Sequence, residues 1–198
     1  MRPFVRTATA LAVVLSAALA AGADWPQFRG PSRDGTSPET GLAPAWPEGG
    51  PPRVLTLSGL GEGWSSPVIV GDRILTAGTR NGYFIVFCFD REGRTLWRAP
   101  CGRAYDGSYP GARSTPTVAG GRVYVLSGQG LLTALTLDAG RKAWMVNIFD
   151  RFGGKPPRFG VAESVLVTGG RVICTPGGKE GTIAALDAAT GSVVWTSN

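Results

Sequence analysis

The sequence predicts an all-β fold, a β-propeller of which about three four-stranded antiparallel blades are present as an incomplete ring. Three observations predict it. Short apolar runs alternate with glycine and proline, which together make up nearly a quarter of the 198 residues. One pattern recurs at an interval of 49 residues. Each recurrence has room for four short strands with turn residues between them, which is typical of propeller blades.

The first half of each repeat reads as a hairpin. A glycine is followed two residues later by an arginine, and both recur 49 residues apart. Glycine reaches the positive φ that tight hairpin turns require, so we expect a short strand on each side, with the arginine opening the second strand. The glycines are Gly71, Gly120 and Gly169, and the arginines are Arg73, Arg122 and Arg171.

The second half of each repeat predicts a third strand, a turn and a fourth strand. An aspartate ends the third strand and is expected to stabilise the turn by accepting backbone N–H groups. A tryptophan lies on the fourth strand, and its buried indole N–H requires an acceptor, which we expect on an adjoining turn. These structural anchors are Asp90, Trp97, Asp138, Trp144, Asp187 and Trp195.

The repeats divide the chain into a leader, an N-terminal segment and the blades. We expect a signal peptide over 1–23, a segment with a latch strand over 24–58, and propeller repeats over 59–198. The blades are expected at about 59–100, 110–149 and 160–198. The latch is expected at 53–57, which precedes the first repeat in the place where Trp97 and Trp144 precede the next two.

The first 23 residues have the three parts of a secretory signal. Arg2 and Arg6 precede an apolar stretch, and Ala21-Gly22-Ala23 offers small residues for cleavage. The stretch is too short to span a bilayer comfortably. The sequence therefore predicts a periplasmic or secreted protein with no integral membrane anchor after cleavage.

Composition argues against several classes of function. Twenty basic and 14 acidic residues give a net charge of +6, but the basic residues are scattered and form no run, so we expect no nucleic-acid partner. The chain has no histidine, which removes the commonest general base and metal ligand. Cys88, Cys101 and Cys174 have no metal-type spacing, and we expect Cys88 to be buried and inert.

The third repeat carries a recognisable motif. Leu186-Asp187-Ala188-Ala189-Thr190-Gly191-Ser192-Val193-Val194-Trp195 resembles the tryptophan-docking repeat of the pyrroloquinoline-quinone-like (PQQ-like) propeller family. The opening Trp25-Pro26-Gln27-Phe28-Arg29-Gly30 resembles the start of exported members. The role of three residues in this opening is left undecided between a capping brace and a surface contact. These residues are Arg29, Arg33 and Asp34. The resemblance implies a quinoprotein-like ring of seven or eight blades, of which this chain is an N-terminal fragment.

The resemblance also implies two functions. The first is a non-catalytic binding or scaffold module, similar to the propeller subunit of the outer-membrane β-barrel assembly machinery. The alternative is a PQQ-dependent alcohol or sugar dehydrogenase whose site lies in downstream blades. Such enzymes hold PQQ beside two adjacent cysteines and bind Ca²⁺ through Glu, Asn and Asp. No adjacent cysteines occur, so the residues present support neither cofactor, and we assign no catalytic, cofactor-binding or metal residue.

Four residues are candidates for a binding mouth of the channel. Arg113 and Glu163 immediately precede the predicted inner strands of the second and third repeats, and Lys155 and Phe159 lie in the long loop before Glu163. Residues at the start of inner strands face the channel opening, where a protein or small-molecule ligand is expected to bind. The alternative is that Arg113 and Glu163 form a structural ion pair between blades.

Overall fold

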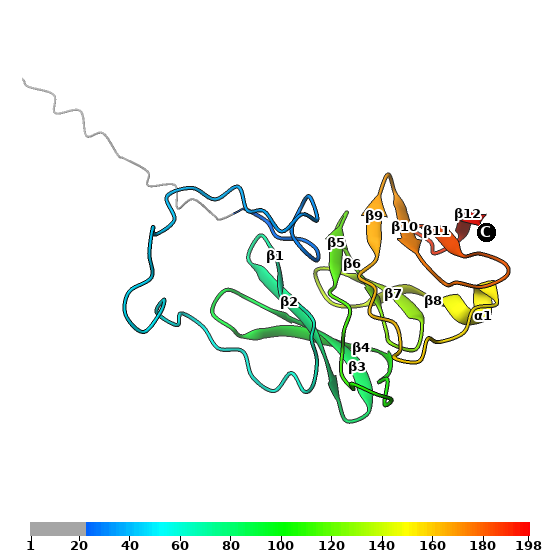
Figure 1. Cartoon of the computed structure of the whole chain (residues 1–198), viewed down its shortest axis with the longest axis horizontal. Helices are drawn as coiled ribbons and strands as arrows, with labels where there is room; N and C mark the ends of the chain where they lie inside the picture. Colours follow the sequence, from blue (N-terminus) through cyan, green and yellow to red (C-terminus); the bar gives the residue numbers. More distant parts are fainter. Residues whose placement is uncertain (1–22) are drawn as a thin grey trace, which may run out of the picture.

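The computed structural model describes residues 23–198, which form three four-stranded antiparallel sheets and one short helix. The predicted signal peptide lies outside these residues except for Ala23. Figure 1 shows the sheets side by side, in chain order. The first blade contains β1 (Val68–Val70), β2 (Arg73–Arg80), β3 (Tyr83–Phe89) and β4 (Thr95–Arg103). The second contains β5 (Thr117–Ala119), β6 (Arg122–Leu126), β7 (Leu131–Thr136) and β8 (Lys142–Asn147). The third contains β9 (Leu166–Thr168), β10 (Arg171–Cys174), β11 (Ile183–Asp187) and β12 (Val193–Ser197).

The predicted hairpins are confirmed. In every blade the strands pair in sequence order, so the first and fourth strands are the edges of the sheet. Gly71, Gly120 and Gly169 have φ of 54° to 57° in the turns between the first and second strands. An L-residue with a side chain reaches this region at a cost, which explains the glycine. An arginine opens each second strand, as expected.

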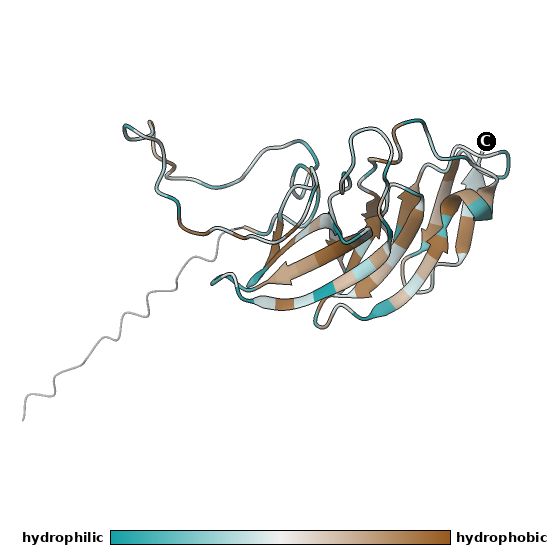
Figure 2. Ribbon diagram, turned by 90° about the horizontal axis from the view of Figure 1, so that it is seen from below, coloured by the Kyte–Doolittle hydropathy of each residue, from teal (hydrophilic) through white to brown (hydrophobic). Residues whose placement is uncertain are grey.

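The core consists of two layers, one on each side of the second blade. Side chains alternate along a strand, so Val123 and Val125 of β6 pack toward the first blade, while Tyr124 and Leu126 pack toward the third. Neither layer exists within a single sheet, because each is closed by the neighbouring blade. Figure 2 shows the apolar residues concentrated on the stacked strands.

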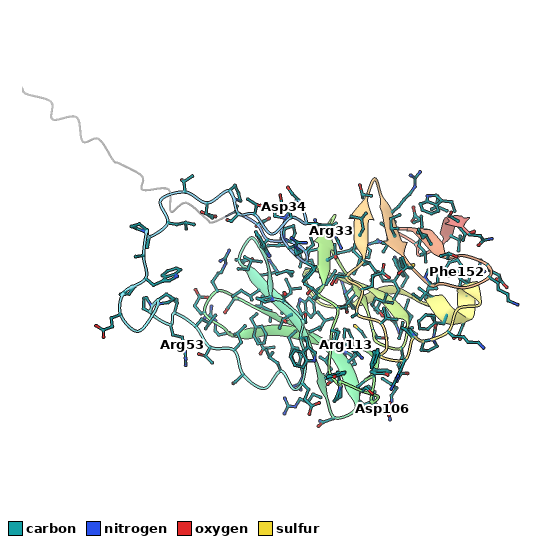
Figure 3. The ribbon with its side chains drawn as sticks, viewed as in Figure 1. Arg33, Asp34, Arg53, Asp106, Arg113 and Phe152 are labelled. Atoms are coloured by element: carbon teal, nitrogen blue, oxygen red, sulfur yellow. The ribbon has the colours of Figure 1, made fainter. Side chains whose placement is uncertain are left out.

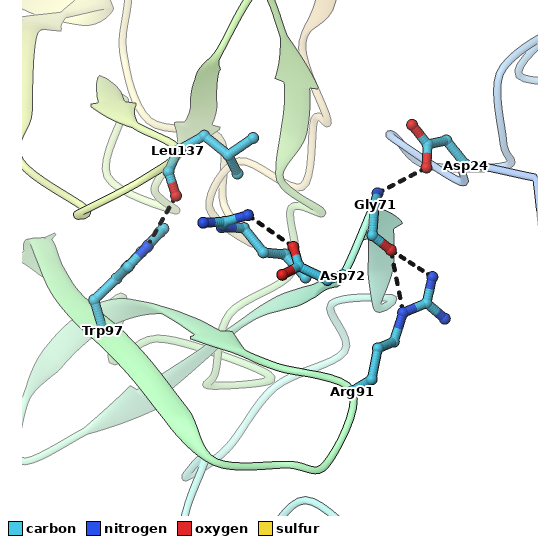
Figure 4. A network of polar contacts seen from close by, with 7 residues as sticks. Asp24, Gly71, Asp72, Arg91, Trp97 and Leu137 are labelled. Carbon is cyan, nitrogen blue, oxygen red and sulfur yellow. Dashed lines mark hydrogen bonds and ion pairs between the residues drawn. The ribbon is translucent and has the colours of Figure 1, made fainter. Parts of the chain in front are cut away.

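Two of the three tryptophans join one blade to the next, as predicted. Trp97 Nε1 donates to the carbonyl of Leu137, 3.0 Å away, in the turn of the second blade (Figure 4). Trp144 Nε1 donates to the carbonyl of Ala188, 3.1 Å away, in the turn of the third. Trp195 has the same register in its own sheet, opposite Ala185, and remains 39% exposed.

Each docked indole rests on a glycine of the receiving turn. A Cβ on Gly140 would lie 2.5 Å from Cε3 of Trp97, and one on Gly191 would lie 2.8 Å from Trp144. The equivalent glycine of the first blade, Gly93, is covered by Leu55, whose Cδ1 would lie 2.8 Å from such a Cβ. A leucine of the N-terminal segment therefore occupies the place of a tryptophan on the first blade.

Residues 53–57 form no strand in the structure. Leu55 and Leu57 are half-buried, while Val54 between them is 95% exposed. This alternation suits a strand, but the latch strand and the division of the chain into domains stay predictions.

The turn aspartates act as predicted in the first and third blades. Asp90 Oδ1 accepts the N–H groups of Glu92 and Arg94, and Asp187 Oδ1 accepts those of Ala189 and Thr190. The second blade differs. Arg73, Arg122 and Arg171 are equivalent, and the register that places Arg171 opposite Asp187 places Arg122 opposite Thr136. Thr136 therefore holds the equivalent position, and Asp138 lies two residues further along. The turn between β7 and β8 is therefore longer than the equivalent turn of the first blade. The spacing from Asp138 to Trp144 in the sequence does not show this.

Hydroxyl groups link the starts of the inner strands across one full repeat. The N–H of Ser66 donates to Thr115 Oγ1 at 3.0 Å, and the N–H of Thr115 donates to Ser164 Oγ at 2.8 Å. Each pair is separated by 49 residues, so every link joins equivalent positions of consecutive blades. These links hold the ends of β1, β5 and β9 together.

One helix was not predicted. Helix α1 (Ile148–Phe152) follows β8, at the predicted end of the second blade near residue 149. Asn147 caps its start by accepting the N–H groups of Phe149 and Asp150, and Gly153 ends it with φ of 67°. Within residues 23–198, no helix has the length and apolar character needed to cross a membrane.

Candidate functional site

The four predicted binding residues lie at the side of the blades that carries the β2–β3, β6–β7 and β10–β11 turns, hereafter the loop side. Arg113 precedes β5 and Glu163 precedes β9, while Lys155 and Phe159 lie in the connection from α1 to β9. The connections between blades and these turns come together here. Figure 3 labels Arg113 and the nearby Asp106.

Glu163 occupies a position that is serine in the other two blades. Ser65 Oγ accepts the N–H of Ala77, and Ser114 Oγ donates to the carbonyl of Leu126. Glu163 Oε2 accepts the N–H of Thr175 at 3.1 Å and the Thr175 hydroxyl. Residues 77, 126 and 175 are 49 apart, so all three side chains close the same gap in their own blades. Glu163 therefore has a structural role within its own blade, through Thr175, and this role differs from the ion pair with Arg113 that its charge suggested.

Lys155 and Glu163 line one groove of about 360 Å³ between the α1–β9 connection and the third blade. Thr175, Pro176, Phe149 and Val161 also line it. Arg113 and Phe159 are not among its lining residues. The structure thus brings together two of the four predicted residues in the groove and places the other two beside it.

Arg113 makes a different contact from the predicted ion pair. The ion pairs of residues 23–198 are Arg73–Asp72, Arg94–Asp90 and Arg94–Glu92, so Arg113 and Glu163 are not paired. The Arg113 guanidinium lies over the ring of Tyr105, 4.9 Å from its centroid. Its Nε and Nη2 atoms are buried and have no hydrogen-bond partner in the described chain.

Phe159 lies in an exposed aromatic pair. It is 46% exposed, and its ring centroid lies 6.2 Å from that of Tyr109, which is 69% exposed. The Arg158 guanidinium lies 5.3 Å from the Phe159 ring centroid. The hydroxyl of Tyr105 donates to the Arg158 carbonyl at 2.6 Å and so joins this pair to Arg113.

We name these five residues, Tyr105, Tyr109, Arg113, Arg158 and Phe159, the loop-side patch. Sequence reasoning identified Arg113 and Phe159 but missed the other three. A signal was present, because Tyr105 and Tyr109 precede Arg113 by eight and four residues in one connection. Tyrosine and arginine close together in an exposed connection are typical of binding surfaces.

The described residues do not fit a Ca²⁺–quinone site. Within 23–198, no three or more histidine, cysteine or acidic side chains lie close enough to hold a metal ion. The three cysteines are free and buried. Burial raises the pKa of the Cys88 thiol to about 11 and those of Cys101 and Cys174 to about 12, so all three stay protonated at neutral pH. No step of a reaction follows from these groups.

Comparison with known families agrees with the blade geometry. The model described as outer membrane protein assembly factor BamB (PQQ_2) matches residues 82–198, which is more than half of the chain. The chain belongs to the BamB-type PQQ-like repeat family. The sequence resembled this family through its tryptophan-docking motif. In the structure this motif forms the four-stranded blades and the contacts between each tryptophan and the next turn.

Three solved structures match this chain over part of their length. The quinohemoprotein alcohol dehydrogenase ADHIIG from Pseudomonas putida HK5 is 24% identical with a TM-score of 0.50, and the match covers 71% of this chain and 21% of that one. BamB from Moraxella catarrhalis is 20% identical with a TM-score of 0.43, covering 65% and 34%. The quinohemoprotein alcohol dehydrogenase from Comamonas testosteroni is 26% identical with a TM-score of 0.49, covering 66% and 20%.

This PQQ-like chain thus spans about a fifth of the length of the two dehydrogenases and about a third of that of the BamB structure. Among curated proteins, no sequence match was found.

Proposed function

We propose that this protein is an exported, non-catalytic binding and scaffold module that holds a protein partner through the loop-side patch. The proposed role is based on that of the outer membrane protein assembly factor BamB, which describes the matching family. After removal of residues 1–23, the mature protein acts in the periplasm or outside the cell. The proposed partner is a component of a machinery that assembles β-barrels in the outer membrane.

The observation that carries the proposal is the chemistry of the patch. Aromatic residues and arginine are enriched where binding energy concentrates, because they offer large rigid areas and oriented donors. Phe159 and Tyr109 are exposed, and the guanidinium groups of Arg113 and Arg158 stack on aromatic rings. Stacking holds these guanidinium groups in place and so lowers the entropy cost of binding.

The groove beside the patch adds a polar edge. Lys155 carries a positive charge at its rim, while the Glu163 carboxylate is already engaged by Thr175. An interface of this kind has an aromatic centre and a polar, solvated rim. A partner with exposed carboxylates suits Lys155, which is exposed and makes no ion pair within residues 23–198. The dehydrogenase alternative places its cofactor site in downstream blades, so its support has to come from residues outside 23–198.

Site-specific photo-crosslinking tests the proposal in cells that make the full-length protein. A photoreactive phenylalanine analogue at Phe159 is expected to crosslink to a component of the outer-membrane assembly machinery. The matched control is the same analogue at Trp46, which is 69% exposed and belongs to the N-terminal segment and not to the patch. Equal crosslinking from both positions, or none from position 159, would overturn the proposal.

A cofactor titration separates the two functions. PQQ added to the purified full-length protein with Ca²⁺ is expected to give no saturable change in quinone absorbance. Saturable binding would favour the dehydrogenase instead.

A further inference from the structure

The inner edges of the three blades are covered by one segment of the same chain. β1, β5 and β9 are edge strands of their sheets, so one side of each strand has N–H and C=O groups without a partner in the sheet. Residues 24–35, hereafter the strap, contact all three strands or their immediate starts. The strap lies beside β1 and β5 in Figure 1.

At the first blade the strap pairs as a strand would. Trp25 and Ile69 of β1 form an antiparallel bridge, with N–H···O distances of 2.8 Å and 2.9 Å in the two directions. Asp24 Oδ1 accepts the N–H of Gly71 at 2.8 Å in the adjoining turn (Figure 4). Both free backbone groups of Ile69 are therefore satisfied.

At the second blade the next residue makes the equivalent contact. The carbonyl of Pro26 accepts the N–H of Val118 in β5 at 2.8 Å. Ile69 and Val118 are 49 residues apart, so two consecutive strap residues bind the same position of two consecutive blades. Proline has no N–H, and at this point the strap needs only to accept.

At the third blade a side chain makes the contact. Arg33 Nη2 donates to the carbonyl of Ser164 at 2.8 Å, and Nη1 donates to that of Val165 at 3.3 Å, just before β9. Nη1 also contacts Gln27 Oε1 at 3.2 Å within the strap. A guanidinium has five donors and no acceptor, which suits two neighbouring backbone carbonyls. Figure 3 shows Arg33 beside β5.

The strap has a defined shape of its own. Arg29 and Arg33 have φ of 64° and 58°, a region that is costly for residues with a side chain. Gly30 is buried under Trp25, where a Cβ would lie 2.6 Å from Cζ3 of the indole. Backbone bonds from Gly30 to Gln27 and from Gly35 to Arg29 close this loop. This costly backbone conformation persists because Trp25, Pro26 and Arg33 hold both ends of the loop against the blades.

We propose that the inner edges of the blades form a peptide-recognition surface and that the strap is its intramolecular occupant. Trp25 and Pro26 pair with the edges of the first two blades, and Arg33 anchors the strap to the third. The surface therefore recognises a segment that pairs as a strand at an aromatic–proline pair, folds into a loop after it and presents an arginine seven residues after the proline. Any other peptide that pairs with these edges has to displace the strap. The proposal is independent of the loop-side patch.

Cleavage of the folded protein tests the proposal. Residues 36–49 are exposed, with Leu42 and Trp46 at 72% and 69%, so a specific protease site inserted there can be cut in the full chain. The strap fragment is expected to stay bound under native conditions during gel filtration. Because hydrogen bonds from a charged group are lost, Arg33→Ala is expected to speed its release by about tenfold. The control Arg53→Ala removes the same charge from an exposed residue and is expected to leave release unchanged.

Immediate loss of the strap from the cut wild-type protein, or equal retention by Arg33→Ala, would overturn the proposal. A second measurement covers the case in which Arg33→Ala does not fold. A synthetic peptide of residues 24–35 is expected to displace a labelled strap from the cut wild-type protein, and the same peptide with Arg33→Ala to require about tenfold more. Equal competition by the two peptides would also contradict the assigned role of Arg33.

Discussion

At the scale of single residues, the contacts between blades depend on a few repeated positions. The docked tryptophan supplies area and one donor, the turn glycine makes room for it, and a hydroxyl links the starts of the inner strands. Glu163 shows how a repeat corrects an interpretation. Its charge and position suggested either a channel-mouth binding role or an ion pair with Arg113, whereas Glu163 bonds to the residue of its blade that is equivalent to the partners of Ser65 and Ser114. That equivalence could be read from the 49-residue spacing, whereas the bond to Thr175 could not.

The two docked tryptophans should differ in their sensitivity to loss of the indole N–H. The Leu137 carbonyl accepts from Trp97, whereas the Ala188 carbonyl accepts from Trp144, Tyr124 and Arg122. Trp97→Phe is therefore expected to lower the free energy of unfolding by about 1–2 kcal/mol more than Trp144→Phe, because one acceptor is left without its donor. Urea denaturation of the two variants measures this. A larger loss for Trp144→Phe would show that the carbonyl contacts do not govern docking.

Asp187 should make stability depend on acid pH. Hydrogen bonds from the side chain and then the backbone of Thr190 lower the pKa of Asp187 below its ordinary value. A folded-state pKa below the unfolded value of about 3.9 means that the carboxylate stabilises the fold at neutral pH, and that this is lost as pH falls below about 4. Asp187→Asn is expected to destabilise the protein at pH 7 and to matter less at pH 3. Denaturant titrations at both pH values test it, and equal losses would contradict it.

At the scale of elements, the hairpins were predictable and the connections were not. The turn glycines and the alternating apolar residues of the sequence predict the hairpins β1–β2, β5–β6 and β9–β10. In the structure these glycines have φ near 55°. Helix α1 was missed because five residues are too few to show a helical period, although its caps Asn147 and Gly153 were legible. Asp138 was aligned wrongly with Asp90 and Asp187, because a threonine, Thr136, holds the position of these aspartates in the second blade and Asp138 lies two residues further along. Tyr105 and Arg158 meet only because two connections fold over the same side.

Two glycines separate backbone strain from the loss of docking. Gly120 and Gly140 have φ of 55° and 64°, but no atom lies within 4 Å of a Cβ on Gly120, whereas the Trp97 ring fills the space above Gly140. Gly120→Ala is expected to cost about 1 kcal/mol through strain alone. Gly140→Ala is expected to lower the free energy of unfolding by about 1–3 kcal/mol more than Gly120→Ala does, because it also pushes the indole away. Thermal or chemical unfolding of the pair measures the difference, and equal costs would argue against ring-on-glycine docking.

At the scale of the molecule, each blade hides its apolar faces against its neighbours. The two core layers lie between blades, and the third blade leaves Leu166, Ile183, Val194 and Trp195 between 37% and 45% exposed. The repeat therefore predicted both the fold and the need for stacking. A capping brace was one of two roles that the sequence left open for Arg33, but its partners could not be foreseen, because the carbonyls that Arg33 reaches lie more than 130 residues away. Backbone acceptors leave no mark in a sequence.

The central claim is that blades of this PQQ-like protein dock through buried indoles. The most direct measurement is hydrogen exchange of the indole N–H groups by NMR, with signals assigned from single Trp→Phe variants. Trp97 and Trp144, which are buried and hydrogen-bonded to the next blade, are predicted to exchange far more slowly than Trp46 and Trp64, which are 69% and 70% exposed. Exchange of Trp97 and Trp144 at the rate of Trp46 and Trp64 would contradict the account.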